Sequence, residues 1–307
     1  MKTNAVQWPT KYDLFGVQIS AVQVDDACDA ILEAAHQGQS AAVSAFSVHA
    51  LIEAATKPPL MAKVNRFGVI TPDGQPVRWA LNWLYGTRLP SNVRGSELMW
   101  RLCQRAETED VSIYLYGGSP ETLAALEANL HIAFPVLKIP GAESPPFRPL
   151  SPAEDAAMVQ RVNASGAGLM FLGLGCPKQD YFAAEHLDSI HAVQLCVGAA
   201  FDFHAGTKSA APVWMQRHGL EWLYRLFQEP RRLWKRYLVT NTIFVAKLFF
   251  AIMQIKLRAI GRLFQKRNNT VPIETEQNDA HSTVRVEAAH PLLRESARAS
   301  STATRHS

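Results

Sequence analysis

The stretch "GLMFLGLGCPKQDYFAAEH", residues 168–186, decides the fold, because an apolar run leads through two glycines directly into a helical pattern. The run 168–173 has the length and composition of a buried strand. Similar runs occur at 16–20, 41–46, 67–70, 111–116 and 192–198, and amphipathic helical patterns lie between most of them, at 24–37, 96–109, 120–130 and 151–164. This alternation predicts an α/β fold with a largely parallel sheet and flanking helices, in which ligands bind beyond the carboxyl ends of the strands.

The chain of 307 residues divides by composition into three segments. We expect an α/β domain over 1–212, in which the Pro-rich segment 139–152 is a loop or a crossover between two halves. Residues 213–267 are predicted to form a basic, amphipathic helical appendage. Residues 268–307 lack apolar periodicity and are predicted to be a disordered tail.

Charge is distributed unevenly along the chain. Residues 214–267 carry 12 Lys and Arg against 2 Asp and Glu, whereas residues 1–213 carry 15 against 20. Such asymmetry indicates an anionic partner. On a helical projection of 240–265 the polar side chains form one stripe and nearly all the others are apolar; the stripe is Thr240, Lys247, Gln254, Arg258, Arg262 and Gln265.

This pattern favours a helix that lies in the interface of an anionic membrane, with its polar stripe facing water. A buried core or oligomer-interface helix and a transmembrane helix are the alternatives, so the sequence does not decide whether residues 238–264 lie on or span the membrane. Nucleic acid is not expected as a partner, because the basic residues accompany a very large apolar face. The oligomeric state, including a homo-oligomer, is left open.

The four cysteines form no CxxC pair and are read as free thiols of a reducing compartment. The N-terminus has no apolar signal segment, so we expect a cytosolic location or the cytosolic face of a membrane. No DxD, GxGxxG, GxxxxGK[ST] or GxSxG motif occurs. We therefore expect no metal and no cofactor, and a dinucleotide-dependent oxidoreductase is disfavoured.

Asp73 lies in "FGVITPDGQPVRWA", residues 67–80, between Pro72 and Gly74. Pro-Asp-Gly is a strong turn signal, and Asp73 could also cap the helix that follows. Pro76 weakens that cap, because it has no N–H to donate. Local sequence alone leaves a structural turn and a catalytic carboxylate equally open.

Two glycine-containing turns are candidate phosphate sites. After Gly175, Cys176 is a poor cap and Pro177 is expected at the first helical position, which would leave the first N–H groups free for a diphosphate beside Lys178 and Gln179. A plain strand-to-helix turn is the alternative. Gly117 and Gly118, before the predicted cap Ser119, would allow close approach of a backbone or a nucleotide.

Three blocks together resemble the WecG/TagA/CpsF glycosyltransferase family (glycosyltransferase family 26). They are "VITPDGQPVRWA", "GLGCPKQDYF" and "CVGAAFDFHAGTKSAAPVWMQRHGLEWLYRLFQEPRRLWKRYL", and the resemblance runs from about residue 14 to residue 238. It implies a Rossmann-like fold and an inverting enzyme on the cytoplasmic face of the bacterial inner membrane. Such enzymes transfer a sugar from a UDP-sugar donor to an undecaprenyl-diphosphate-linked acceptor during exopolysaccharide or other cell-surface polymer synthesis.

The resemblance also assigns residues. It implies that Asp73, followed by Gly74, is the general base, and that arginines of the appendage close over the site. Arg217, Arg225 and Arg231 are the candidates, although the spacing of Arg217, Glu221 and Arg225 equally suits a salt-bridged helix face.

One block departs from the family pattern. The family usually reads Thr-x-Asn and then His after the second strand, where this chain has Ser44, Phe46 and His49. Phe46 replaces an amide expected near the sugar, so the resemblance leaves N-acetylmannosamine and glucose both open. A non-catalytic, membrane-bound scaffold of a polysaccharide assembly complex is the alternative function.

Overall fold

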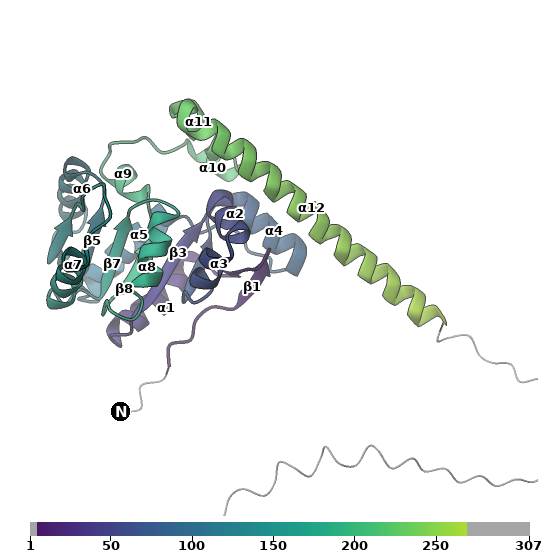
Figure 1. The fold of residues 1–307 in the computed structure, drawn as a ribbon, viewed down its shortest axis with the longest axis horizontal. Coiled ribbons are helices and arrows are strands. Elements are labelled where there is room, and N and C mark those ends of the chain that lie inside the picture. Colours follow the sequence, from purple (N-terminus) through teal and green to yellow (C-terminus); the bar gives the residue numbers. More distant parts are fainter. Residues whose placement is uncertain (1–4, 269–307) are drawn as a thin grey trace, which may run out of the picture. The chain divides into compact units, whose positions relative to one another are not determined.

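The computed structural model describes residues 5–268, apart from the side chains of residue 232 and of residues 258–268. The described residues up to Ala259 form one compact unit, which is built on a six-stranded sheet (Figure 1). The strands are β3 (Ala41–Phe46), β4 (Val69–Pro72), β5 (Ile113–Gly117), β6 (Gly141–Glu143), β7 (Leu169–Gly173) and β8 (Val193–Cys196). They run parallel in the order β4-β3-β8-β7-β5-β6. The predicted α/β fold with a parallel sheet is confirmed.

Helices cover both faces of this sheet. They are α1 (Val24–His36), α2 (Val48–Thr56), α3 (Pro58–Val64), α4 (Gln75–Tyr85), α5 (Gly95–Thr108), α6 (Pro120–Ala133), α7 (Pro152–Ala164), α8 (Lys178–Glu185) and α9 (Ala200–His204). Successive strand residues enter opposite cores: Leu169 and Phe171 pack with α1, α5 and α6, whereas Met170 and Leu172 pack with α2, α3 and α8. Burial on both faces explains why the strands read as continuous apolar runs.

All six predicted strands are present, and the prediction of a loop over 139–152 is wrong at β6. There Gly141–Glu143 pairs with β5 at the sheet edge, opposite Tyr114–Tyr116. Gly141 is required, since a Cβ on it would lie 2.2 Å from the Tyr114 ring. A three-residue edge strand beside prolines shows no periodicity of its own. A hairpin of β1 (Lys11–Leu14) and β2 (Val17–Ser20), only partly foreseen, precedes the main sheet.

The C-terminal part of the described chain is helical. It contains α10 (Val213–Arg217), α11 (Glu221–Gln228) and the 39-residue α12 (Pro230–Asn268). Whether residues 213–267 act as a separate appendage stays a prediction, and the predicted tail lies, after its first residue, outside the described residues. The segment Leu233–Leu257 is long and apolar enough to cross a membrane.

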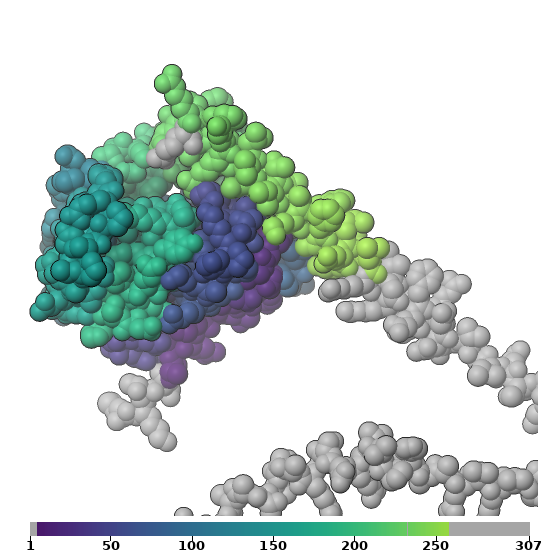
Figure 2. Space-filling model, in the orientation of Figure 1, coloured from purple at the N-terminus to yellow at the C-terminus, as the bar shows by residue number. Residues whose placement is uncertain are grey.

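One side of α12 packs on the α/β unit and the other side is exposed. Thr240, Phe244 and Leu248, spaced four residues apart, are buried, and the Lys247 ammonium lies 5.8 Å from the centroid of the Phe15 ring. The prediction that the polar stripe faces water is therefore wrong for Thr240, and Lys247 is only partly exposed, whereas Gln254 is exposed as predicted. The exposed side carries many large apolar side chains, among them Leu238, Val239, Val245, Phe249, Phe250, Met253 and Leu257. We call these seven residues the apolar face of α12; the helix is drawn in green to yellow in Figure 2.

Candidate active site

A cavity of about 720 Å³ lies at the carboxyl ends of the parallel strands. Its wall comes from the residues at or just after five strand ends, namely Ala45 and Ser47, Asp73, Gly118 and Ser119, residues 173–176 and residues 197–200. Residues of α11 and α12 complete it: Glu221, Arg225 and Arg236. A cavity therefore lies where the sequence predicts the ligand site, beyond the carboxyl ends of the strands.

Asp73 enters the cavity from the turn between β4 and α4. Its backbone N–H donates to the carbonyls of Phe46 and Thr71, each at 3.0 Å. Gly74, with φ of +90°, is the N-cap residue of α4, and no side chain caps this helix. The helix-cap alternative for Asp73 is therefore wrong, and its carboxyl group is left to the cavity.

The pKa of Asp73 is raised from its ordinary value of 3.8 to about 7. Burial is the main cause and the nearby Glu221 carboxylate adds to it, while Arg225 and Arg94 lower the pKa and Glu97 raises it slightly. The carboxyl group is thus poised to exchange a proton near neutral pH, as a general base must.

Five basic side chains line the same cavity: Arg94, Lys178, Lys208, Arg225 and Arg236. Two of them are held by acids, since Lys208 pairs with Asp202 at 2.9 Å and Glu229 at 3.3 Å, and Arg94 pairs with Glu97 at 3.4 Å. The Arg225 guanidinium lies 5.8 Å from the centroid of the Phe203 ring. The cavity therefore offers one carboxyl group with a raised pKa together with several cations, an arrangement suited to an anionic leaving group.

The start of α8 differs from the prediction. The helix begins at Lys178, with Pro177 as its N-cap residue, so Pro177 precedes the first helical position. The N–H of Gln179 donates to the Gly175 carbonyl at 2.9 Å, and the N–H of Asp180 donates to the Pro177 carbonyl at 3.1 Å. The expectation that the first-turn N–H groups are free for a diphosphate is wrong for these two, because the tight turn uses them.

Lys178, Gln179 and Gly175 nevertheless line the cavity as predicted. Gln179 is 5% exposed, and its Oε1 accepts a hydrogen bond from the Gly175 N–H at 3.1 Å. The carboxamide oxygen is thereby used within the turn, so the NH₂ group is the part of this side chain that could donate to a ligand.

The paired glycines have different roles. A Cβ on Gly117 would lie 2.7 Å from the carbonyl carbon of Gly173, so Gly117 serves the close approach of β5 and β7. Gly118 lines the cavity. Ser119 caps α6 as predicted, accepting a hydrogen bond from the Thr122 N–H at 3.2 Å.

The family model for the WecG/TagA/CpsF glycosyltransferases matches residues 12–258. The chain belongs to this family. The match contains every residue that lines the cavity, from Ala45 to Arg236. The protein is therefore a glycosyltransferase, and the family implies a nucleotide-sugar donor and an acceptor for it.

Several residues that the resemblance suggested lie outside the cavity lining of this glycosyltransferase. Ser44 is buried and donates from Oγ to Asp180 Oδ1 at 2.7 Å. His49 Nδ1 is buried and has no hydrogen-bond partner among the described residues, and burial lowers the pKa of His49 to about 4. Phe46, 1% exposed, packs in the core instead of near a sugar.

Of the predicted arginines, only Arg225 lines the cavity of the glycosyltransferase. Arg217 and Arg231 are exposed elsewhere. Arg217 ends α10, and Gly219 with φ of +72° turns the chain before α11 begins at Glu221, so Arg217 and Arg225 do not share a helix face. Sequence reasoning missed Arg94, which no local pattern marks, and noted Arg236 only as part of a basic cluster.

At the cavity mouth, Phe147 is 95% exposed. Its loop is anchored on both sides, by the Ser144 hydroxyl donating to the Gly118 carbonyl at 2.7 Å and by two contacts of 2.8 and 2.6 Å between Arg148 and Glu154. Prolines 145, 146 and 149 stiffen it further. This part of the glycosyltransferase thus holds an aromatic ring in solvent where a planar ligand group could stack on it.

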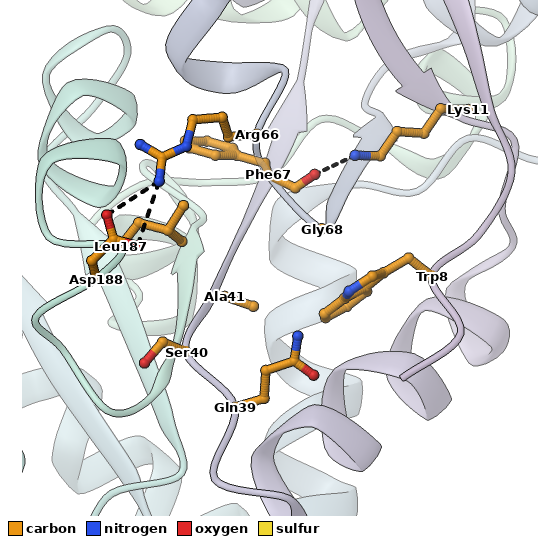
Figure 3. A pocket seen from close by; sticks show the side chains of 10 residues that line it. All are labelled: Trp8, Lys11, Gln39, Ser40, Ala41, Arg66, Phe67, Gly68, Leu187 and Asp188. Atoms are coloured by element: carbon orange, nitrogen blue, oxygen red, sulfur yellow. Dashed lines mark hydrogen bonds and ion pairs between the residues drawn. The ribbon is translucent and has the colours of Figure 1, made fainter. Parts of the chain in front are cut away.

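A second hollow, of about 490 Å³, lies at the opposite end of the strands, near the starts of β3 and β4 (Figure 3). Its cations are used by the protein itself: Lys11 donates to the Phe67 carbonyl, and Arg66 pairs with Asp188 at 3.2 Å. It also lies at the end of a parallel sheet that ligands do not usually occupy. We therefore place the active site of the glycosyltransferase in the larger cavity.

Proposed function

We propose that this protein transfers a sugar from a UDP-sugar to a polyprenyl-diphosphate-linked sugar at the cytoplasmic face of a bacterial membrane, with inversion at the anomeric carbon. N-acetylmannosamine and glucose are the two donor sugars that the resemblance supports. The product would serve cell-surface or exopolysaccharide synthesis.

The observation that carries this proposal is the Asp73 carboxyl group, in the cavity with a pKa raised to about 7. It would take the proton of an acceptor hydroxyl while the hydroxyl oxygen forms a bond to the anomeric carbon. The bond from that carbon to the diphosphate oxygen breaks on the opposite face, and the electron pair leaves with UDP. One base and one displacement give inversion.

The basic wall of the cavity supports the second half of this step. The leaving diphosphate gains negative charge as the bond breaks, and Lys178, Arg225, Arg94 and Arg236 are the cations that could stabilise it. Arginine suits this role because its planar guanidinium can donate two parallel hydrogen bonds to a phosphate.

The sheet order supports an orientation for the donor. Asp73 follows β4 at one edge of the sheet, and Phe147 follows β6 at the other. A nucleotide-sugar is long enough to extend along the cavity between these two edges, with its sugar toward Asp73 and its base toward Phe147. The diphosphate would then lie between them, over the ends of β7 and β8.

The apolar face of α12 supports a lipid-linked acceptor. A solvent-exposed row of large apolar side chains is costly in water and is typical of a membrane-contacting surface. The opposite side of the helix, at Thr240, Phe244 and Leu248, packs on the catalytic core. Contact with the membrane surface keeps that packing, whereas spanning would break it, so we favour a peripheral location.

A panel of UDP-sugars assayed against diphospholipid-linked N-acetylglucosamine and glucose tests the proposal. We expect one pair to release UDP and to give a product whose mass has increased by one sugar. Asp73→Ala should abolish transfer while the far-UV circular dichroism is unchanged. Vesicle binding without UDP release from any pair would instead support the non-catalytic scaffold.

A further inference from the structure

A second carboxyl group, that of Asp180, lies behind the cavity wall and has no role in the proposed reaction. It is 1% exposed and belongs to the first turn of α8. The Ser44 hydroxyl donates to its Oδ1 at 2.7 Å, and the neighbouring Cys176 side chain favours its charged form. In the described part of the chain no Lys, Arg or His pairs with it. A buried carboxylate without a cation is costly unless other groups compensate for its charge.

The N-terminus of α8 supplies part of this compensation. The first turn of a helix carries a partial positive charge, and a contact of 2.7 Å is typical of a hydroxyl bonded to a carboxylate. The protein's own carboxylate thus occupies the end of α8 at which an external anion would otherwise bind. A diphosphate in the cavity must then depend on side-chain cations, Lys178 among them.

Asp180 connects three segments that meet at the cavity. Ser44 belongs to β3, where it pairs with Ile70 of β4 and Cys196 of β8. Cys176 belongs to the turn before α8 and lines the cavity. Asp180 therefore fixes, from the buried side, the same turn that presents Lys178 and Gln179 on the cavity side.

We propose that Asp180 is a positioning residue: its hydrogen bond from Ser44, beside Cys176, holds the turn of residues 173–179 so that Lys178 and Gln179 face the donor diphosphate. The identity of that ligand rests on the proposed function, but the position of the turn does not. Ser44 acts through Asp180 and does not touch the sugar.

A double-mutant cycle, measured through UDP affinity, tests whether Ser44 and Asp180 act through one shared interaction. We expect Ser44→Ala and Asp180→Ala each to weaken UDP binding about tenfold, as for the loss of a hydrogen bond to a charged group. The double variant should be no weaker than the more severe single variant, because both changes break one interaction. Ser44→Thr keeps a hydroxyl and should restore binding. Independent, additive effects would overturn the link.

The reactivity of the Cys176 thiol tests, without any ligand, whether Asp180 holds the turn of residues 173–179 in place. The other three cysteines are fully buried, so a disulfide dye that reports thiol exchange reads mainly Cys176. We expect Ser44→Ala and Asp180→Ala to speed its modification several-fold in folded protein. Ser20→Ala is the matched control, since Ser20 is equally buried and bonds the Ile70 N–H at 3.2 Å, away from this turn.

These two readouts separate the proposals. Unchanged Cys176 reactivity in both variants would overturn the positioning role, whatever the enzyme's substrate. Altered reactivity in a protein whose wild type does not bind UDP would support the positioning role and contradict the UDP-sugar proposal instead.

Discussion

At the scale of single residues, Asp73 and Asp180 show how one physical effect serves two purposes. Burial raises the pKa of both carboxyl groups, to about 7 and about 6. The other influences on Asp73 are charges across a cavity, whereas Asp180 accepts a hydrogen bond from the Ser44 hydroxyl and lies beside the Cys176 thiol. The first group can therefore exchange protons with a substrate, and the second can only hold its neighbours in place.

The raised pKa of Asp73 predicts the pH dependence of transfer. A general base works only when ionised, so kcat/KM should rise tenfold per pH unit below pH 7 and level off above it. Initial rates of UDP release between pH 5 and pH 9 measure this profile. A profile that is flat through pH 7, or that falls on the alkaline side of it, would contradict the assignment of Asp73 as the base.

Asp73→Asn should lose activity and gain stability. Transfer should fall by about 10²–10⁴-fold, the usual contribution of a general base. Because the folded-state pKa of about 7 lies above the ordinary 3.8, the wild type loses folding stability as the pH rises from 4 to 7. Asparagine cannot ionise, so the variant should be more stable at pH 8, by about 1–3 kcal/mol, and equal to the wild type near pH 4. Thermal unfolding at both pH values measures this, and a variant less stable at pH 8 would contradict it.

At the scale of elements, hydrophobic patterning predicts the sheet but not the residues that line the cavity away from the strand ends. The strands show in the sequence because burial on both faces demands unbroken apolar runs. The Pro-Asp-Gly turn places Asp73 at a strand end, but only the resemblance to the family distinguishes it from a structural turn residue. Arg94 and Arg236 could not be predicted as site residues, since they reach the cavity only through tertiary packing. The prediction of a free anion site at the start of α8 is wrong because the sequence does not reveal the hydrogen bonds of this turn. There the backbone N–H groups of Gln179 and Asp180 donate to the carbonyls of Gly175 and Pro177.

The next prediction concerns helix α11, which places Arg225 at the cavity. Arg217, at the end of α10, lies outside the cavity lining. Arg225→Ala should raise the KM for the donor tenfold or more through the loss of a charged hydrogen bond to the diphosphate. Arg225→Lys should recover only part of the affinity. Arg217→Ala, on an exposed side chain outside the cavity lining, should change the donor KM less than twofold. Equal losses for Arg217 and Arg225 would show that the functional helix arrangement differs from the one described.

At the scale of the whole molecule, α12 packs on the catalytic core and is the element that we propose to contact the membrane. Truncation before Leu238 would remove Phe244 and Leu248 from the core, so loss of membrane binding in such a variant could reflect unfolding. Substitution of the exposed side avoids this difficulty. The helix therefore offers a test in which folding and membrane binding can be separated.

Replacing Phe249 and Phe250 together by Asp should release the protein from vesicles that contain anionic lipid, because both side chains are more than half exposed on the apolar face of α12. Co-sedimentation should fall at least tenfold, while the melting temperature stays within a few degrees of the wild type. Transfer to a full-length lipid acceptor in vesicles should fall with binding, whereas transfer to a short, water-soluble analogue should persist.

Phe244→Ala is the control with the opposite outcome: it should lower the melting temperature, since Phe244 is 5% exposed, yet leave the folded fraction bound to vesicles. If the double variant still sediments with vesicles, the apolar face of α12 is not the membrane-binding surface, and association between copies of the chain becomes the better account of it.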